Sequence, residues 1–79
     1  MVNVILPELG EDITKATIAG WMCREGDQIK EGDDIVEVVT DKAVFNVPAS
    51  ASGKVKQIRF KEGEEAHIGA VLAVIDPVN

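Results

Sequence analysis

The centre of the chain contains the stretch Ile35-Val36-Glu37-Val38-Val39-Thr40-Asp41-Lys42-Ala43-Val44-Phe45-Asn46-Val47. It consists of two apolar runs, residues 35–39 and 43–47, on either side of a short polar segment. In the second run the odd-numbered residues face one way and the even-numbered residues the other, as in a half-buried antiparallel strand. The stretch therefore predicts a tight β-hairpin whose tip is Thr40-Asp41-Lys42.

The polar segment has the composition of a turn. Aspartate is favoured in such turns because its carboxylate accepts hydrogen bonds from nearby backbone N–H groups. We expect Asp41 to do this and Lys42 to stand at the tip, surrounded by water. A lysine in a turn is ordinary, so the hairpin by itself assigns Lys42 no function.

The rest of the chain has the same character as the hairpin. Seven glycines separate short runs of β-branched residues, and no uninterrupted window of a dozen residues has the 3.6-residue period of a helix. The runs are residues 2–6, 17–21, 35–40, 44–47, 54–60 and 71–75. We therefore predict an all-β fold, a flattened sandwich or barrel.

A weak internal repeat divides the chain into two halves. A shift of 37 residues places Arg24-Glu25-Gly26-Asp27 on Lys61-Glu62-Gly63-Glu64 and Gly32 on Gly69. Each half would then hold a long strand, a turn, a short strand, a second glycine turn and an apolar strand, and neither half could close a core alone. We expect two antiparallel sheets of about four strands each, related by a pseudo-twofold axis.

The halves differ in one loop. Pro7 and Gly20 are 13 positions apart, whereas Pro48 and Gly53 are 5 apart, so the first half carries about eight extra residues within 8–15. An acidic loop with apolar residues suits a contact surface, although a tolerated surface insertion fits its composition equally well. The candidate contact residues are Glu8, Leu9, Gly10, Glu11, Asp12 and Ile13.

Length and charge exclude several classes of function. A chain of 79 residues with three aromatic side chains cannot enclose a deep active site, so we expect a non-catalytic module. Eight basic against fourteen acidic residues give a net charge of −6. This acidic balance disfavours nucleic acid and anionic membranes, whose phosphates need a basic footprint. A protein partner with a basic rim remains compatible.

The remaining polar and aromatic residues receive structural interpretations. Cys23 has no partner for an internal disulfide, which favours a reducing compartment, and we interpret it as a small strand residue. His67 and the acidic turn around Asp33 are expected to be solvated, and Trp21 to lie at the edge of the core. The expected core is Val4, Leu6, Ile18, Ile29, Val36, Val38, Phe45, Val47, Val55, Ile58, Leu72 and Val74.

Several of these segments together resemble a known family. Residues 26–43, Val47-Pro48-Ala49 and Gly53-Lys54-Val55 resemble the lipoyl domain of 2-oxo acid dehydrogenase complexes. The opening Leu6-Pro7-Glu8-Leu9-Gly10-Glu11 is similar to the usual L-P-x-[IL]-G-E start of that family. The likeness covers nearly the whole chain, and Thr-Asp-Lys-Ala between two strands is its most specific part.

The resemblance implies a function for the hairpin. Lys42 would bear lipoic acid in amide linkage, attached by a lipoate ligase or lipoyl transferase, and Thr40, Asp41 and Ala43 would form the turn recognised during modification. In the family, a thiamine-dependent 2-oxo acid decarboxylase reductively acylates the lipoyl group. The dihydrolipoyl acyltransferase core passes the acyl group to coenzyme A, and dihydrolipoyl dehydrogenase reoxidises the arm. The domain would thus carry and not catalyse.

Two alternatives and three further expectations accompany this resemblance. Biotin carrier domains share the fold but flank their lysine with methionines, whereas Asp41 and Ala43 flank Lys42, which favours lipoate. An unmodified interaction module of lipoyl-like fold is the other alternative.

We expect residues 1–76 to form the domain and 77–79 to begin a linker of a longer acyltransferase. The isolated domain is expected to be monomeric. The expected compartment is the bacterial or archaeal cytoplasm, or the mitochondrial matrix in a eukaryote, with no targeting segment or membrane span.

Overall fold

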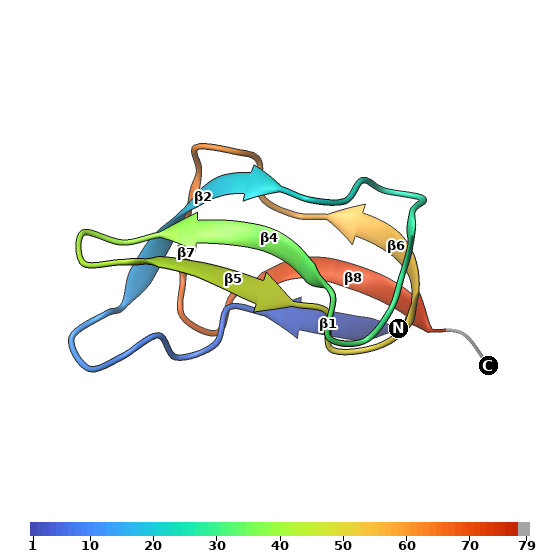
Figure 1. The fold of residues 1–79 in the computed structure, drawn as a ribbon, viewed down its shortest axis with the longest axis horizontal. Coiled ribbons are helices and arrows are strands. Elements are labelled where there is room, and N and C mark those ends of the chain that lie inside the picture. The colour runs from blue at the N-terminus through green and yellow to red at the C-terminus, as the bar shows by residue number, and fades with distance from the viewer. Residues whose placement is uncertain (78–79) are drawn as a thin grey trace.

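Eight strands form two antiparallel sheets in the computed structural model, which describes residues 1–77 (Figure 1). The strand order is β1-β8-β6-β3 in one sheet and β5-β4-β2-β7 in the other. The predicted all-β, two-sheet class is confirmed. The described residues form no helix, and hence none that could cross a membrane. The strands are β1 (Val2–Ile5), β2 (Lys15–Trp21), β3 (Gln28–Ile29), β4 (Asp34–Val39), β5 (Val44–Pro48), β6 (Gly53–Ile58), β7 (Glu65–His67) and β8 (Val71–Pro77).

The predicted repeat is visible in the turns that follow β2 and β6. Gly26 and Gly63 both have positive φ, +95° and +92°, a conformation that glycine adopts without steric cost. The Gly26 N–H donates to the Val55 carbonyl at 2.7 Å, and the Gly63 N–H donates to the Ile18 carbonyl at 2.8 Å. The two donors are 37 residues apart in sequence, and so are the two acceptors. Each half is therefore bound to the other by an equivalent hydrogen bond.

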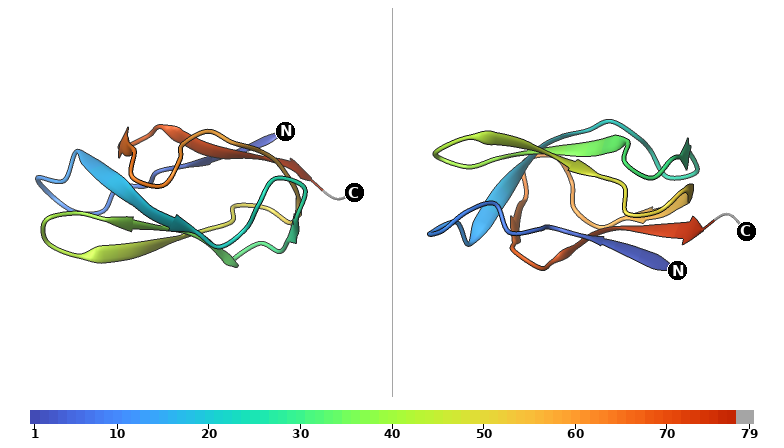
Figure 2. Two further views of the ribbon diagram at one scale, coloured as in Figure 1. Left: turned by 90° about the horizontal axis from the view of Figure 1, so that it is seen from above. Right: turned by 60° about the horizontal axis from the view of Figure 1, so that its bottom comes forward.

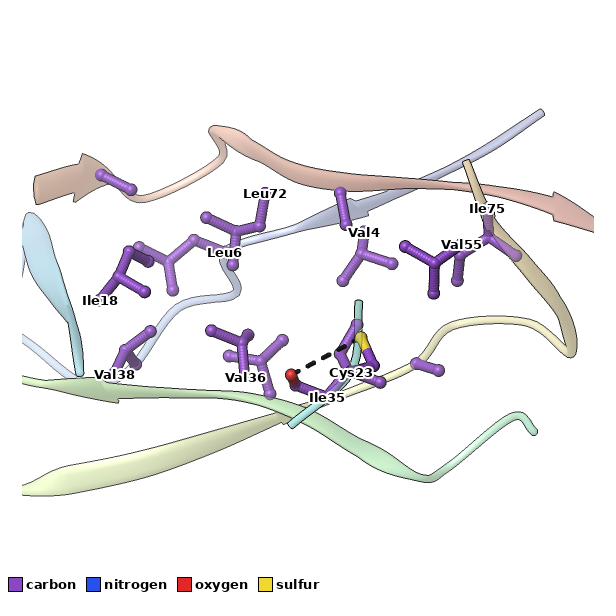
Figure 3. Packing of buried hydrophobic residues seen from close by; sticks show 14 of the residues in the cluster. Val4, Leu6, Ile18, Cys23, Ile35, Val36, Val38, Val55, Leu72 and Ile75 are labelled. Atoms are coloured by element: carbon purple, nitrogen blue, oxygen red, sulfur yellow. Dashed lines mark hydrogen bonds between the residues drawn. The ribbon is translucent and has the colours of Figure 1, made fainter. Parts of the chain in front are cut away.

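Each of the two sheets contains strands from both halves of the sequence. β1 and β3 of the first half pair with β8 and β6 of the second, while β5 and β7 of the second half pair with β4 and β2 of the first. Side chains from both sheets fill the space between them, as Figure 3 shows. Because each four-stranded sheet contains strands from both halves, neither half can complete a sheet or close the core alone.

The predicted core is largely confirmed, with one error in β8. Nine of the predicted residues are buried, and Phe45 and Ile58 are partly buried against them. Val74 is wrong: Ala73 and Ile75 face the core with Leu72, and Val74 lies outside it. In the pairing with β1, Val4 lies opposite Ala73 and Ile5 opposite Val71, which leaves Leu72 in a bulge. A bulge changes the phase of the alternation, so consecutive residues point inward.

The same irregularity occurs in the first half. In the β4–β5 pairing, Asp34 lies opposite Pro48 and Val36 opposite Val47, which leaves Ile35 unpaired, and Ile35, Val36 and Val38 are all buried. These three residues stand 37 positions before Leu72, Ala73 and Ile75. The bulges therefore belong to the repeat.

The molecule is elongated, with extents of 38 × 21 × 17 Å, and its two ends differ. β1 begins and β8 ends at one end, whereas the β4–β5 turn and the β1–β2 loop lie at the other (Figures 1 and 2). β8 continues through Pro77, and residues 78 and 79 of the expected linker lie outside the described residues.

The extra loop of the first half is six residues long, not eight. Leu6 and Ala49 are equivalent, because their N–H groups donate to the carbonyls of Ala70 and Asp33, which are 37 residues apart. Eleven residues, 7–17, separate Leu6 from Ile18, whereas five, 50–54, separate Ala49 from Val55. The two prolines are thus not equivalent positions, which explains the error.

Candidate functional site

The β4–β5 hairpin holds its tip on regular strand pairing. Beyond the bulge at Ile35 the pairing is unbroken from Val36 opposite Val47 to Val39 opposite Val44, and β2 supports β4 from its other side. Lys42 is exposed in the turn beyond the last pair, as the sequence predicts. Its ammonium group forms no hydrogen bond or ion pair with any described residue. The hairpin thus presents a free primary amine on a fixed base.

Thr40, not Asp41, satisfies the backbone of the turn. The Thr40 hydroxyl accepts from the N–H groups of Lys42 and Ala43, both at 3.1 Å. The expectation that the Asp41 carboxylate accepts these bonds is wrong, because the hydroxyl of the first turn residue already takes both donors. Asp41 and Ala43 are exposed beside Lys42, where their side chains are open to an approaching protein.

A groove of about 440 Å³ lies beside this turn. The end of the extra loop, the start of β2, the hairpin turn and β7 contribute to it. The lining residues are Asp12, Ile13, Thr14, Lys15, Ala16, Thr17, Val39, Thr40, Asp41 and Glu65. The loop and the hairpin, which are far apart in sequence, therefore form one surface next to Lys42.

The side chains that line the groove have a net negative charge. Three carboxylates line it, those of Asp12, Asp41 and Glu65. Its one lining cation, Lys15, lies 3.5 Å from a Glu65 carboxylate oxygen in an exposed pair. Exposed pairs of this kind contribute little to stability. The remaining negative charge favours a partner with basic residues near Lys42.

The structure divides the predicted contact residues into two groups. Asp12 and Ile13 line the groove, whereas Glu8, Leu9, Gly10 and Glu11 do not, and Leu9 packs against the core. Glu65 belongs to the groove but was missing from the prediction. No local pattern could reveal it, because the pairing of Thr17 with Glu65 joins β2 to β7 across 48 residues of sequence.

The loop has a defined conformation. Asp12 is the only described non-glycine residue with positive φ, at +68°, a conformation that aspartate tolerates better than most residues. The Ile13 N–H donates to the Gly10 carbonyl at 3.3 Å, and the Ile68 N–H donates to the Thr14 carbonyl at 3.0 Å. These bonds fix the side of the groove that the loop supplies.

Cys23 has a structural role. It is buried just beyond the end of β2, and its Sγ lies 3.9 Å from the Ile35 carbonyl oxygen (Figure 3). Burial raises the pKa of the Cys23 thiol, and the nearby Asp27 carboxylate raises it further. His67 is exposed on β7, so the two residues form no nucleophile–base pair. The neutral, buried thiol is unsuited to act as a nucleophile.

Two other interpretations from the sequence are confirmed. Trp21 is half-buried at the edge of the core, where its Nε1–H donates to the Phe60 carbonyl at 2.9 Å. Asp33 is exposed in its turn, as expected, and its carboxylate accepts a hydrogen bond from the Lys30 N–H at 3.0 Å. Residues 1–77 contain no group of three or more His, Cys, Asp or Glu side chains able to hold a metal ion.

The fold and the site define an all-β domain that presents one unpaired lysine at a hairpin tip beside an acidic groove. The model of the biotinyl/lipoyl family, described as "Biotin-requiring enzyme", matches residues 2–75. The chain belongs to this biotinyl/lipoyl family. The resemblance that the sequence indicates is thereby confirmed.

Curated relatives are acyltransferase components of dehydrogenase complexes. The chain is 38% identical over 69 residues to the dihydrolipoyllysine-residue acetyltransferase component of the Acholeplasma laidlawii pyruvate dehydrogenase complex. It is 35% identical over 74 residues to the lipoamide acyltransferase component of the Bacillus subtilis branched-chain alpha-keto acid dehydrogenase complex. These matches cover 87% and 94% of the chain but only 13% and 18% of the relatives.

Solved structures agree with this assignment. The lipoyl domain of the 2-oxoglutarate dehydrogenase complex from Azotobacter vinelandii matches with a TM-score of 0.79 and 29% identity, and each chain is covered completely. A urea carboxylase from Kluyveromyces lactis matches with a TM-score of 0.77 and 26% identity over 92% of this chain and 6% of its own. The fold is therefore that of a lipoyl domain and is shared with a segment of a carboxylase.

Proposed function

We propose that Lys42 bears an amide-linked lipoyl group and that this domain carries acyl groups and electrons between active sites of a 2-oxo acid dehydrogenase complex. The observation that carries the proposal is the free, exposed Lys42 ammonium at the tip of the β4–β5 hairpin. The names of the relatives, which specify dihydrolipoyllysine and lipoamide, support lipoate. So do Asp41 and Ala43, which stand where biotin carrier domains have methionines.

The environment of Lys42 fits acylation of its amine. Acylation removes a positive charge, and the Lys42 ammonium takes part in no ion pair that this would break. The side chain is exposed, so an attached group stays in water and displaces no core residue. Modification therefore leaves the folded state intact.

The hairpin also suits a carrier mechanically. A lipoyl group on Lys42 would supply a dithiolane able to take up an acyl group together with two electrons, pass the acyl group to coenzyme A and return the electrons to a flavoprotein. A long flexible tether on a fixed turn raises the effective concentration of its end at each nearby site. The two-sheet frame holds Lys42 in one place, which limits the conformations that a partner must recognise.

The partners follow from the same proposal. They are a thiamine-dependent decarboxylase, an acyltransferase core, dihydrolipoyl dehydrogenase and the ligase or transferase that attaches lipoate. The relatives belong to pyruvate, branched-chain and 2-oxoglutarate complexes, and the proposal covers this class of 2-oxo acids. The proposal places the domain within a longer acyltransferase, in the bacterial or archaeal cytoplasm or the mitochondrial matrix.

Intact-mass analysis after incubation with lipoate ligase, ATP and lipoate tests the proposal. We expect a mass gain of one lipoyl group on the wild type and none on Lys42→Arg, which keeps the charge but cannot form the amide. Lys30→Arg, an exposed turn lysine, is the matched control and should gain the full mass. A parallel incubation with biotin ligase should give no gain. An unmodified wild type would favour the interaction-module alternative, and a gain only with biotin would favour the biotin carrier.

A further inference from the structure

The Thr40 hydroxyl uses its complete hydrogen-bonding capacity within the hairpin turn. It accepts from the N–H groups of Lys42 and Ala43 at 3.1 Å each and donates to the Ala43 carbonyl at 3.2 Å. A hydroxyl group has one donor and two acceptor lone pairs, so nothing is left over for a partner. The role of Thr40 is therefore internal to the turn.

These bonds replace the bond that usually closes a four-residue turn. In most such turns the N–H of the fourth residue donates to the carbonyl of the first. Here the Ala43 N–H goes to the side chain of Thr40, as in turns where a hydroxyl mimics a backbone acceptor. The same hydroxyl fixes the N–H of Lys42, and thus the direction in which the Lys42 side chain leaves the backbone.

Few other contacts order this turn. The last ladder pair is Val39 with Val44, and beyond it one backbone bond remains, from the Thr40 N–H to the Ala43 carbonyl at 2.9 Å. The Asp41 side chain forms no hydrogen bond within residues 1–77, and the Ala43 methyl group cannot form one. Without the Thr40 hydroxyl, the N–H groups of Lys42 and Ala43 would face only water, and the turn could adopt several conformations.

We infer that Thr40 is a positioning residue that holds Lys42 in the geometry accepted by the modifying enzyme. This inference rests on the proposed function. An enzyme that binds one turn geometry sees an apparent affinity reduced by the fraction of molecules in that geometry. The chemical step in the bound complex is not reduced in the same way. Loss of the hydroxyl should therefore raise KM and leave kcat largely unchanged.

Thr40→Val tests this inference because it keeps the size and branching of the side chain but removes the hydroxyl. We expect KM for lipoate ligase to rise about tenfold and kcat to stay within about twofold, as a tenfold loss of the competent conformer requires. Amide exchange at Lys42 and Ala43, measured by NMR, should accelerate by about the same factor. Thr40→Ser restores the hydroxyl and should return both quantities toward the wild type.

Ser52→Ala is the matched control. The Ser52 hydroxyl accepts from the Glu31 N–H at 2.9 Å in a turn outside the hairpin and the groove, so its loss should change neither KM nor amide exchange at Lys42 and Ala43. Acetylation of Lys42 by N-acetoxysuccinimide is a second control. Its rate should be equal in all variants, because a small reagent needs only an exposed amine.

The outcomes separate this inference from the function on which it rests. A wild type that the ligase does not modify overturns the carrier function itself. A wild type that is modified, together with an unchanged KM in Thr40→Val, overturns only the role of Thr40. The role is also overturned if Thr40→Ser fails to restore KM, or if chemical acetylation slows in parallel with the ligase reaction.

Discussion

The two halves of the molecule have the same arrangement of strands and turns but differ in architecture at one end. They share the glycine turns at Gly26 and Gly63 and the bulges at Ile35 and Leu72, in each case 37 residues apart. The first half alone has the six-residue loop insertion. Its last strand, β4, turns into the hairpin that bears Lys42, whereas the equivalent strand β8 leads to the end of the described chain.

This difference separates stability from function. The shared features hold the sheets together, so a change to them in either half should lower the free energy of unfolding of the whole domain. The unshared features lie together at the end opposite the termini, where they form the acidic groove beside Lys42 (Figure 1). Changes there should alter recognition and leave stability nearly unchanged.

The largest effect is expected from truncating the two bulge residues. Ile35→Ala and Leu72→Ala each remove a fully buried side chain from equivalent positions and should each lower the free energy of unfolding by about 3 kcal/mol. Urea denaturation of the two variants measures this. If only one variant loses stability and the other is as stable as the wild type, the two halves do not contribute equally to the free energy of unfolding.

A smaller effect is expected where the halves have different residues at one equivalent position. Gly53 corresponds to Ala16, and a Cβ on Gly53 would lie 2.1 Å from the Asp76 carbonyl oxygen. Since backbone must move to relieve this clash, Gly53→Ala should cost about 2 kcal/mol. Ala16→Gly, the reverse change, should cost about 1 kcal/mol through chain entropy. Thermal or urea unfolding decides the order, and equal costs would contradict the close approach of β6 and β8.

The smallest effect on stability is expected from removing the insertion. Deletion of residues 8–13 leaves five residues between Leu6 and Ile18, as between Ala49 and Val55. We expect the domain to fold with a loss of about 1 kcal/mol, chiefly from the contacts of Leu9. Ligase modification of Lys42 should continue, whereas reductive acylation by the cognate decarboxylase should fall about tenfold, equivalent to about 1.4 kcal/mol of recognition. Unchanged acylation would remove the loop from the contact surface.

The sequence predicts features that depend on local pattern. Alternation in residues 43–47 and the glycines at 26, 32, 63 and 69 predict the hairpin, the turns and the repeat. The burial of Ile75 in place of Val74 could not be predicted, because the phase of β8 is set by its bulge against β1. Phase changes of this kind depend on the pairing partner.

The site shows the same division. The exposed tip position of Lys42 follows from two strands that meet at a short polar segment. The groove could not be predicted from the sequence, because Glu65 is brought to it only by the pairing of β7 with β2. Residue preference assigns the hydrogen bonds of the turn to Asp41, and only the three-dimensional arrangement shows that the Thr40 hydroxyl accepts from both N–H groups.

Tandem mass spectrometry of the wild-type domain after treatment with lipoate ligase locates the modification among its six lysines. The hairpin geometry predicts that the lipoyl group is found on Lys42 alone, with the lysines of the shared frame, such as Lys54 and Lys61, unmodified. Modification at another lysine, or its spread over several exposed lysines, would contradict the conclusion that the hairpin tip is the attachment site.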